Sequence, residues 1–287
     1  MASIYKSEAG KQAVEAFYRS ALERWPVPHR ELIVPTRHGD TFIVASGDEH
    51  APPLVLFHGS GANSIVWIRD ITEWARGHRV YAIDLIGEPG LSAASRPPLR
   101  SDAYAEWLDD VWNHLGLAAA SIVGVSFGGW LALEYAVKRP ARVGSLSLVS
   151  PSGIGSQNVG TLVKAGLLRM LGPWGLRRSL RLVAGRKGVP VEVSDFVMLV
   201  FRNFRPRMEK LPIRTDQELA ALTMPVQVIV GRNDSLIRSD ETRDRVQRHV
   251  RQLRLTYLEG EGHILPRQTR TIAQFLSAPA VRELVAG

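Results

Sequence analysis

The chain has 287 residues and a mass of 31.7 kDa, which fits two domains or one large α/β unit with an insertion. Hydrophobic residues make up 45 % of the chain and charged residues 22 %, so it can form a large core. There is no run of 18 apolar residues, which excludes a transmembrane helix, and no cysteine, which excludes disulfides and cysteine-ligated metals. Charges throughout the first 25 residues leave no apolar signal-peptide region, so the sequence favours a cytoplasmic location.

The net charge of +8 is concentrated in one segment. Residues 161–214 hold 12 lysines and arginines but only three acidic residues, a net charge of +9, whereas the remainder of the chain carries −1. A nucleic-acid-binding protein would need its basic residues interleaved with stacking aromatic residues on a recognisable module, and this sequence has no such pattern. The basic segment therefore needs a different explanation.

The first predicted elements are a helix and a hairpin. Residues 7–24 form an amphipathic pattern that begins after Ser7, a suitable N-cap, and ends before Pro26. Two short β-rich runs follow, Glu31–Thr36 and Thr41–Ala45, and the turn sequence between them predicts a hairpin.

From residue 54 onward, continuous apolar runs alternate with helical patterns, which is typical of buried parallel strands separated by helices. The predicted strands are Leu54–Phe57, Val80–Ile83, Ile122–Val125, Leu146–Val149, Val226–Val230 and Leu253–Leu258. The predicted helices are Ile65–Arg76, Ser101–Leu115, Gly129–Arg139, Asp216–Leu222, Ser239–Val250 and Thr269–Ala286. The alternation predicts an α/β fold, a mostly parallel sheet of about eight strands flanked by helices, with an antiparallel start.

The alternation is interrupted after the sixth strand, Leu146–Val149, and resumes only at residue 226. The interruption contains the basic segment and three helix-like stretches, 162–171, 175–184 and 193–204. A long insertion at the carboxyl end of a strand is usually functional rather than a simple connection.

The motif that indicates chemistry is Gly124-Val125-Ser126-Phe127-Gly128, which lies between a predicted strand and a predicted helix. In this setting the serine occupies a tight, strained turn, and small neighbours are needed for the chain to pass. The turn holds the hydroxyl of Ser126 above the edge of the sheet, and the N-terminus of the following helix offers N–H groups to a developing oxyanion. Ser126 is therefore the candidate nucleophile.

A serine nucleophile needs a base and an acid that orients the base, in the chain order Ser, Asp or Glu, His. Asp234 follows the predicted strand Val226–Val230, and His263 follows the last predicted strand. Both positions lie at the carboxyl edge of the sheet, where Ser126 also lies. His249 is the competing histidine, but it falls within a predicted helix and favours a surface role.

The loop after the strand Leu54–Phe57 predicts the second half of an oxyanion hole. Glycines around Ser60 let the backbone approach a negative charge closely, so the N–H of Ser60, or that of Gly61, would pair with the N–H of Phe127. His58 in the same loop is interpreted as a structural residue that bonds the loop backbone.

These motifs resemble the α/β-hydrolase fold superfamily, and several further segments resemble bacterial carboxylesterases of the naproxen-esterase type. The further segments are Trp25-Pro26-Val27, Ala45-Ser46-Gly47, Ala51-Pro52-Pro53-Leu54, Asp84-Leu85-Ile86-Gly87 and Tyr104–Gly116. The similarity covers residues 20–270 and is weakest across 155–213. The resemblance implies an α/β-hydrolase fold, with Ser126 as nucleophile, His263 as general base and acid, and Asp234 as its orienting acid.

The resemblance also implies a division of the chain into an N-terminal helical arm (1–30), a core (31–152 and 215–287) and a basic helical cap over the active site (153–214). One loop departs from the superfamily, in which D-x-x-G-x-G-x-S is common after the fourth strand. Here that loop reads Asp84-Leu85-Ile86-Gly87-Glu88-Pro89-Gly90-Leu91-Ser92, which weakens any transfer of substrate preference. Because position 126 is serine rather than aspartate, haloalkane dehalogenase and epoxide hydrolase chemistry are disfavoured.

The leading functional hypothesis is a serine hydrolase that cleaves the carboxylic ester of a small molecule through an acyl-enzyme. This mechanism requires no metal and no organic cofactor. The candidate substrate-contacting residues are Gly61, Leu167, Met170, Trp174 and Met198. The last four suit an apolar acyl pocket, but such residues equally suit the packed core of the cap. In this hypothesis Arg177, Arg178, Arg181, Arg202, Arg205 and Arg207 form a solvated outer face.

Other functions remain open at this point. A thioesterase, cyclase or acyltransferase would use the cap's positive charge to steer a substrate held by coenzyme A or by an acidic carrier protein. A carbon–carbon bond hydrolase with the same triad and a non-catalytic binding protein are weaker alternatives. The basic cap would also suit contact with an anionic membrane surface, without stable insertion into the membrane. The sequence leaves the oligomeric state open.

Overall fold

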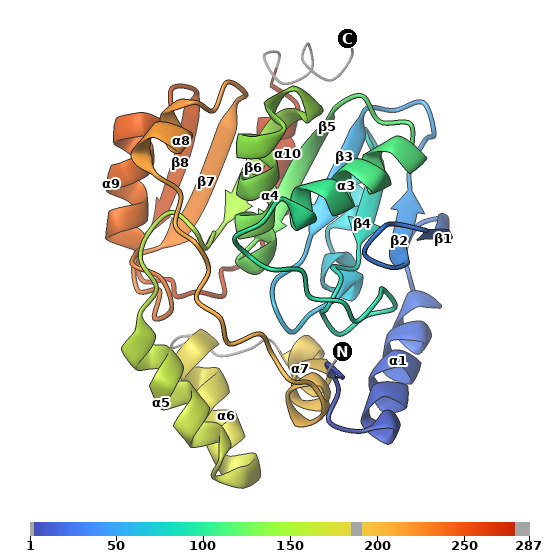
Figure 1. Cartoon of the computed structure of the whole chain (residues 1–287), viewed down its shortest axis with the longest axis vertical. Helices are drawn as coiled ribbons and strands as arrows, with labels where there is room; N and C mark the ends of the chain where they lie inside the picture. Colours follow the sequence, from blue (N-terminus) through green and yellow to red (C-terminus); the bar gives the residue numbers. More distant parts are fainter. Residues whose placement is uncertain (1–2, 185–190, 279–287) are drawn as a thin grey trace.

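Eight strands form one sheet in the computed structural model, which describes residues 3–184 and 191–278 (Figure 1). The strand order is β1-β2-β4-β3-β5-β6-β7-β8, and β2 alone runs antiparallel to its neighbours. The strands are β1 (His29–Val34), β2 (Thr41–Ser46), β3 (Pro53–Phe57), β4 (Arg79–Ile83), β5 (Ala120–Val125), β6 (Val143–Val149), β7 (Val226–Gly231) and β8 (Leu253–Leu258). The predicted mostly parallel sheet of eight strands with an antiparallel start is confirmed.

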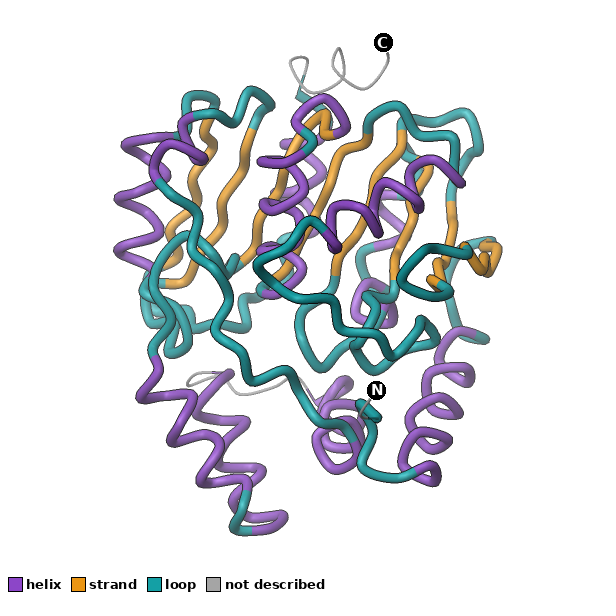
Figure 2. The backbone as a smooth tube through the Cα atoms, in the orientation of Figure 1, coloured by secondary structure: helices purple, strands orange, loops and turns teal. Residues whose placement is uncertain are grey.

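Helices flank the sheet and also lie beyond its carboxyl edge (Figure 2). The α-helices are α1 (Glu8–Leu22), α2 (Ile71–Trp74), α3 (Ala103–His114), α4 (Phe127–Lys138), α5 (Val159–Arg169), α6 (Gly172–Ala184), α7 (Val191–Asn203), α8 (Asp216–Ala220), α9 (Ser239–His249) and α10 (Thr269–Leu276). Two short 3-10 helices are η1 (Ser64–Trp67) and η2 (Pro140–Arg142).

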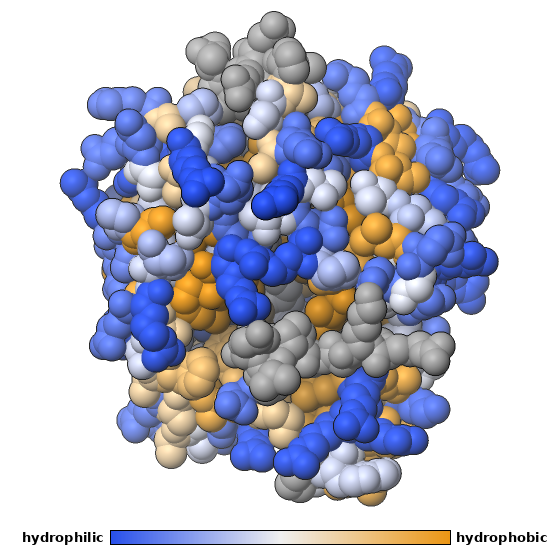
Figure 3. Space-filling model, turned by 180° about the vertical axis from the view of Figure 1, so that it is seen from behind, coloured by the Kyte–Doolittle hydropathy of each residue, from blue (hydrophilic) through white to orange (hydrophobic). Residues whose placement is uncertain are grey.

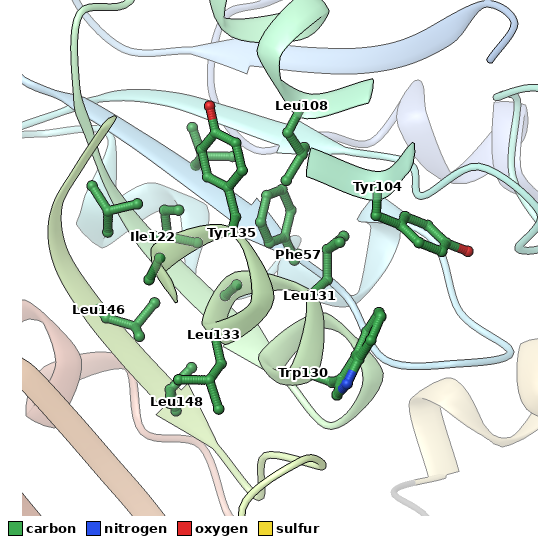
Figure 4. Packing of buried hydrophobic residues seen from close by; sticks show 14 of the residues in the cluster. Phe57, Tyr104, Leu108, Ile122, Trp130, Leu131, Leu133, Tyr135, Leu146 and Leu148 are labelled. Carbon is green, nitrogen blue, oxygen red and sulfur yellow. The ribbon is translucent and has the colours of Figure 1, made fainter. Parts of the chain in front are cut away.

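Both faces of the central strands are buried, as continuous apolar strands require. On β3, Val55 and Phe57 point to the face covered by α3 and α4, whereas Leu54 and Leu56 point to the opposite face. Figure 4 shows the first of these layers, where Phe57 packs between the sheet and the leucines of α3 and α4. The nucleophile turn between β5 and α4 is thus anchored at both ends in a packed core.

Two predicted helices are shorter than expected. The predicted helix 65–76 is instead η1 followed by the single turn α2, because its sequence is rich in β-branched residues that disfavour a continuous helix. The predicted helix 269–286 ends at Leu276, two residues before Ala278, whose conformation is restricted by the proline that follows it. The remainder of that prediction, from residue 279, lies outside the described residues.

The N-terminal helix begins as predicted, since the side chain of Ser7 accepts a hydrogen bond from the N–H of Gly10. It packs on α7, where the rings of Phe17 and Phe196 stack with their centres 5.5 Å apart. It also contacts the core through the Tyr18 hydroxyl, which donates to Asp84 at 3.0 Å. Phe17 and Phe196 are 179 residues apart in the sequence, so two distant segments, α1 and α7, lie side by side beneath the sheet in Figure 1.

The inserted segment between β6 and β7 contains α5, α6 and α7. Its two ends meet, because the N–H of Arg214 donates to the carbonyl of Gly153 at 2.8 Å. The guanidinium of Arg214 also pairs with Glu134 of α4 at 2.8 Å, which fixes this junction to the core. Within residues 3–184 and 191–278, no helix combines the length and the apolar character that crossing a membrane requires.

Candidate active site

Ser126 lies on the turn between β5 and α4 with an unusual backbone conformation, φ 52° and ψ −109°. A positive φ is strained for a residue with a side chain, so the surrounding packing must hold it. The neighbouring glycines explain how the turn fits. A Cβ on Gly124 would lie 2.5 Å from the carbonyl oxygen of Gly128, and one on Gly128 would lie 2.2 Å from that of Phe57.

Two loops from neighbouring strands bring a histidine and an aspartate to this turn. The Nδ1 of His263, after β8, lies 2.7 Å from Oδ2 of Asp234, after β7. The Nε2 of the same histidine lies 3.0 Å from Oγ of Ser126. Both side chains of the Asp–His pair are buried, the aspartate with 1 % of its side chain exposed and the histidine with 9 %. The structure therefore brings the three predicted triad residues into one hydrogen-bonded line.

The hydrogen bonds around Asp234 determine which ring nitrogen of His263 carries the proton. Oδ1 of Asp234 accepts hydrogen bonds from the N–H groups of Leu236 at 2.8 Å and Ile237 at 3.0 Å. These bonds hold the carboxylate so that Oδ2 faces the histidine. A carboxylate only accepts, so Nδ1 of His263 carries the proton and Nε2 is left to accept from the hydroxyl of Ser126.

The loop after β3 passes next to the serine. A Cβ placed on Gly59 would lie 3.6 Å from Cβ of Ser126. Among the described residues, the N–H groups of Ser60 and Phe127 donate to no protein acceptor, whereas the N–H of Gly61 donates to Glu88 at 2.6 Å. The alternative donor Gly61 is thus already occupied, which leaves Ser60 as the partner for Phe127 in the predicted oxyanion hole.

His58 is buried beside this loop and bonds only backbone. Its Nδ1 donates to the carbonyl of Gly59 at 2.8 Å, and its Nε2 accepts from the N–H of Leu85 at 3.0 Å. Burial lowers the pKa of His58, which keeps the ring neutral in this arrangement. The interpretation of His58 as a residue that bonds the loop backbone is confirmed. His249 lies in α9 near Asp216, as its helical position indicated.

Two residues of this site were missed in the sequence. Ser150 follows β6 and donates its hydroxyl to the carbonyl of His263 at 2.9 Å, which fixes the histidine loop. Glu88 lies in the loop after β4 that departs from the superfamily pattern. Its Oε2 accepts from the N–H of Gly61 and from the hydroxyl of Ser60 at 3.2 Å, so it holds the oxyanion loop. The sequence signal for Ser150 was its place at the carboxyl end of a strand, and for Glu88 it was a place in the loop that departs from the superfamily pattern.

Glu88 is fully buried, and desolvation raises the pKa of its carboxyl group from 4.5 to about 7. The N–H of Gly61 and the hydroxyl of Ser60 favour the charged form and oppose this shift, as do the charges of Arg96 and Arg207. The raised pKa means that burial outweighs these favourable contacts. The oxyanion loop therefore rests on a carboxyl group that titrates near neutral pH.

We expect the Glu88→Gln variant to have a flatter pH dependence of stability than the wild type. A raised pKa means that the folded state binds more protons than the unfolded state between pH 4.5 and 7. The stabilisation is present below pH 4.5 and lost as the pH rises through 7. Between pH 5 and pH 8 the wild type should lose about 2–3 kcal/mol of unfolding free energy relative to the variant. Urea unfolding at several pH values measures this.

The control for that experiment is Glu49→Gln, which neutralises an exposed glutamate on the loop between β2 and β3. This variant should follow the pH dependence of the wild type. Equal slopes for Glu88→Gln and the wild type would contradict the assigned titration of Glu88.

The four candidate acyl-pocket residues are not packed together. Leu167 on α5, Met170 at the C-cap of α5 and Trp174 on α6 are 61 %, 79 % and 63 % exposed, so they do not form the packed core of an inserted domain. Met198 is half-buried on α7. Helix α7 of the insertion comes close to the oxyanion loop, since a Cβ on Gly61 would lie 4.0 Å from Cγ1 of Val200.

The predicted solvated face of arginines is only partly correct. Arg177, Arg178 and Arg181 are exposed, but the side chain of Arg207 is only 7 % exposed. Its guanidinium pairs with Glu209 at 2.8 Å and lies over the ring of Tyr104. The stem of an arginine packs well on apolar surface, which explains this burial. Within the described ranges, no cluster of three or more histidine, aspartate or glutamate side chains is arranged to hold a metal ion.

A sequence profile of the alpha/beta hydrolase family matches residues 54–277, and the chain belongs to this family. It is similar to two curated proteins of Bacillus subtilis strain 168. It is 29 % identical to the uncharacterized carboxylesterase nap over 262 residues (88 % of this chain, 87 % of that protein) and 28 % identical to carboxylesterase YbfK over 266 residues (90 % and 89 %).

Solved structures show the same likeness. The crystal structure of carboxylesterase CesB (YbfK) from Bacillus subtilis matches with a TM-score of 0.82 and 26 % identity, covering 93 % of this chain and 97 % of that one. The crystal structure of naproxen esterase from the same organism matches with a TM-score of 0.79 and 25 % identity, covering 94 % and 96 %. The resemblance to carboxylesterases of the naproxen-esterase type is thereby confirmed.

Proposed function

We propose that this protein is a serine hydrolase that cleaves a carboxylic ester of a small molecule through an acyl-enzyme. The observation that supports this most strongly is the hydrogen-bonded line from Asp234 through His263 to Ser126, on a strained turn at the carboxyl edge of the sheet. The similarity over most of the chain to proteins named carboxylesterases supports ester hydrolysis as the reaction class.

In the first half of the proposed cycle, Nε2 of His263 takes the hydroxyl proton as Oγ of Ser126 attacks the ester carbonyl carbon. The carbonyl π electrons move to oxygen, and the N–H groups of Ser60 and Phe127 stabilise the oxyanion. The tetrahedral intermediate collapses with cleavage of the bond to the alkoxy group. The imidazolium returns the proton to the leaving alcohol, which leaves an acyl group on Ser126.

In the second half, His263 deprotonates a water molecule, whose oxygen attacks the acyl carbon. The intermediate collapses to release the carboxylic acid, and the proton returns to Oγ of Ser126. Asp234 remains ionised throughout and stabilises the imidazolium in both halves. Glu88 acts as a positioning residue. It accepts hydrogen bonds from the N–H of Gly61 and the hydroxyl of Ser60, and so holds this loop while the N–H of Ser60 points to the oxyanion.

The proposal is tested by comparing p-nitrophenyl butyrate with butyryl-coenzyme A at rising salt concentrations. We expect faster turnover of the ester, with a rate that changes little with salt, because the ester is neutral. The alternative, a thioesterase or acyltransferase on an anionic carrier, predicts the opposite preference. Its rate on the coenzyme A substrate should fall as salt screens the basic inserted segment. That second pattern would overturn the proposal.

A further inference from the structure

An apolar stripe is exposed along one side of α5 and around the turn into α6. Val159, Val163, Leu167 and Met170 recur at the i, i+4, i+8 and i+11 positions of one helix face. The stripe continues around the turn through Leu171 and Trp174. These six residues, hereafter the apolar stripe, are exposed by 54 % at Val159 to 79 % at Met170. Isolated exposed apolar residues are ordinary, but a contiguous row of six on one surface is not.

The stripe is not the contact face between the two helices. Among the α5 side chains that the structure describes, the buried one is Ala165, which lies on the opposite side of the helix, and α6 approaches closely there. A Cβ on Gly175 would lie 1.8 Å from the carbonyl oxygen of Leu168, so only glycine permits this approach. The two helices thus already bury their facing sides, and no described residue covers the apolar stripe.

The helix pair projects from the body of the molecule. At its base, the N–H of Asn158 donates to the carbonyl of Leu236, and the hydroxyl of Ser235 donates to that of Leu182, each at 2.8 Å. The turn between α5 and α6 lies at the end of the pair away from the sheet (Figure 1). Since α5 has 11 residues, this turn is about 16 Å from the base.

Positive charge accompanies the stripe. Residues 157–184 contain five lysines and arginines and no acidic residue. Arg177, Arg178 and Arg181 lie on the exposed face of α6 with Trp174, and Lys164 lies beside the stripe on α5. None of these four exposed cations forms an ion pair with a described residue. In Figure 3, hydrophilic and hydrophobic side chains adjoin at the lower right, where this helix pair lies after the half turn.

We propose that the apolar stripe and these four cations form a docking surface for an anionic lipid bilayer. The apolar side chains would enter the boundary between headgroups and acyl chains, and the cations would lie among the anionic headgroups. The surface is a projecting ridge, which fits a deformable lipid surface without a matching groove. The absence of acidic residues from the pair removes any repulsion from that surface.

Docking would bring the candidate active site close to the membrane. Ser235, which anchors the base of the helix pair, directly follows Asp234 in the sequence. The inference does not depend on the hydrolytic function proposed above, because lipid binding is measured without substrate.

The test is co-sedimentation of the full chain with vesicles of phosphatidylcholine containing about 30 % phosphatidylglycerol, beside pure phosphatidylcholine vesicles. We expect at least tenfold stronger partitioning onto the anionic vesicles at about 50 mM salt, and a large decrease at about 500 mM salt. The triple variant Arg177→Gln, Arg178→Gln, Arg181→Gln should lower partitioning on the order of 100-fold, since each basic residue near such a surface contributes about fivefold. The double variant Val163→Ser, Leu171→Ser should lower it at least tenfold.

The matched control is Arg248→Gln, Arg251→Gln, Arg254→Gln. It removes the same charge from exposed arginines around the start of β8, at the amino ends of the strands and away from the carboxyl edge where the helix pair is anchored. This control should partition like the wild type, and melting temperatures should show that all variants are folded. Equal losses from the two triple variants would overturn the proposal in favour of net charge alone. Absence of binding to anionic vesicles, or a wild-type dimer that Val163→Ser, Leu171→Ser converts to a monomer, would also overturn it.

Discussion

Ser126→Ala is expected to abolish ester hydrolysis, lowering kcat on the order of 10⁴-fold or more. The hydroxyl of Ser126 is the only nucleophilic group that Nε2 of His263 reaches among the described residues, at 3.0 Å. Without it no acyl-enzyme forms, and only oxyanion stabilisation of direct attack by water remains. Steady-state kinetics with a p-nitrophenyl ester measure the loss. Intact-protein mass after treatment with a fluorophosphonate should show one adduct on the wild type and none on the variant.

The matched control for this experiment is Ser277→Ala, which removes an exposed hydroxyl that bonds only within the end of α10. The control should keep its adduct and its activity. The Ser126→Ala variant should also fold, because alanine keeps the Cβ of serine and loses only Oγ. It therefore adds no atom that could clash with Gly124 or Gly128 at the turn. Full activity in a folded Ser126→Ala protein would place the nucleophile elsewhere and contradict the proposed mechanism.

The nucleophile turn was predictable because its constraints are local. Gly124 and Gly128 stand on either side of Ser126, and the structure shows that each has no room for a Cβ. A motif of this kind reports steric limits that apply within a few residues of chain. Asp234 and His263 were also predictable, since parallel strands bring their carboxyl ends to the same edge of the sheet.

The supporting residues were not predictable, because their roles depend on contacts between distant segments. Glu88 acts on a loop 27 residues earlier in the chain, and Ser150 acts on one 113 residues later. No local sequence pattern predicts which distant loop each residue contacts. The sequence also does not distinguish a glutamate that is buried in the fold from an exposed glutamate in a loop. Whether the N–H of Ser60 or that of Gly61 is free to donate to the oxyanion likewise depends on where the carboxylate of Glu88 lies.

The inserted helices depart from the usual rule that the apolar face of a helix packs against the protein core. The helix-like stretch predicted over residues 162–171 is present as α5 (Val159–Arg169), and Val159, Val163 and Leu167 share one of its faces. Periodicity shows which residues share a face, but it does not show what covers that face. The apolar stripe is exposed instead of packed. The N-terminal helix shows the reverse case, since its apolar face packs on α7, a partner far away in the sequence.

The second large effect is expected from Asp234→Asn, with a decrease of kcat on the order of 10⁴-fold and little loss of stability. In the wild type, Oδ1 accepts from the N–H groups of Leu236 and Ile237, so only an oxygen fits on that side. The amide oxygen of asparagine would keep these two bonds and turn its NH₂ group toward His263. The NH₂ group donates, so Nδ1 must accept, and the ring proton moves to Nε2, where it blocks proton transfer from Ser126.

Asp234→Ala separates this tautomer effect from a structural one, because alanine loses both the contact with His263 and the two backbone bonds. It should therefore lower the melting temperature as well as kcat, whereas Asp234→Asn should lower kcat alone. Asp240→Asn, an exposed aspartate at the start of α9, is the control for amide substitution and should keep wild-type activity. Activity of Asp234→Asn within tenfold of the wild type would mean that a different group orients the imidazole. In that case the 2.7 Å contact between Asp234 and His263 would not set the tautomer of the base.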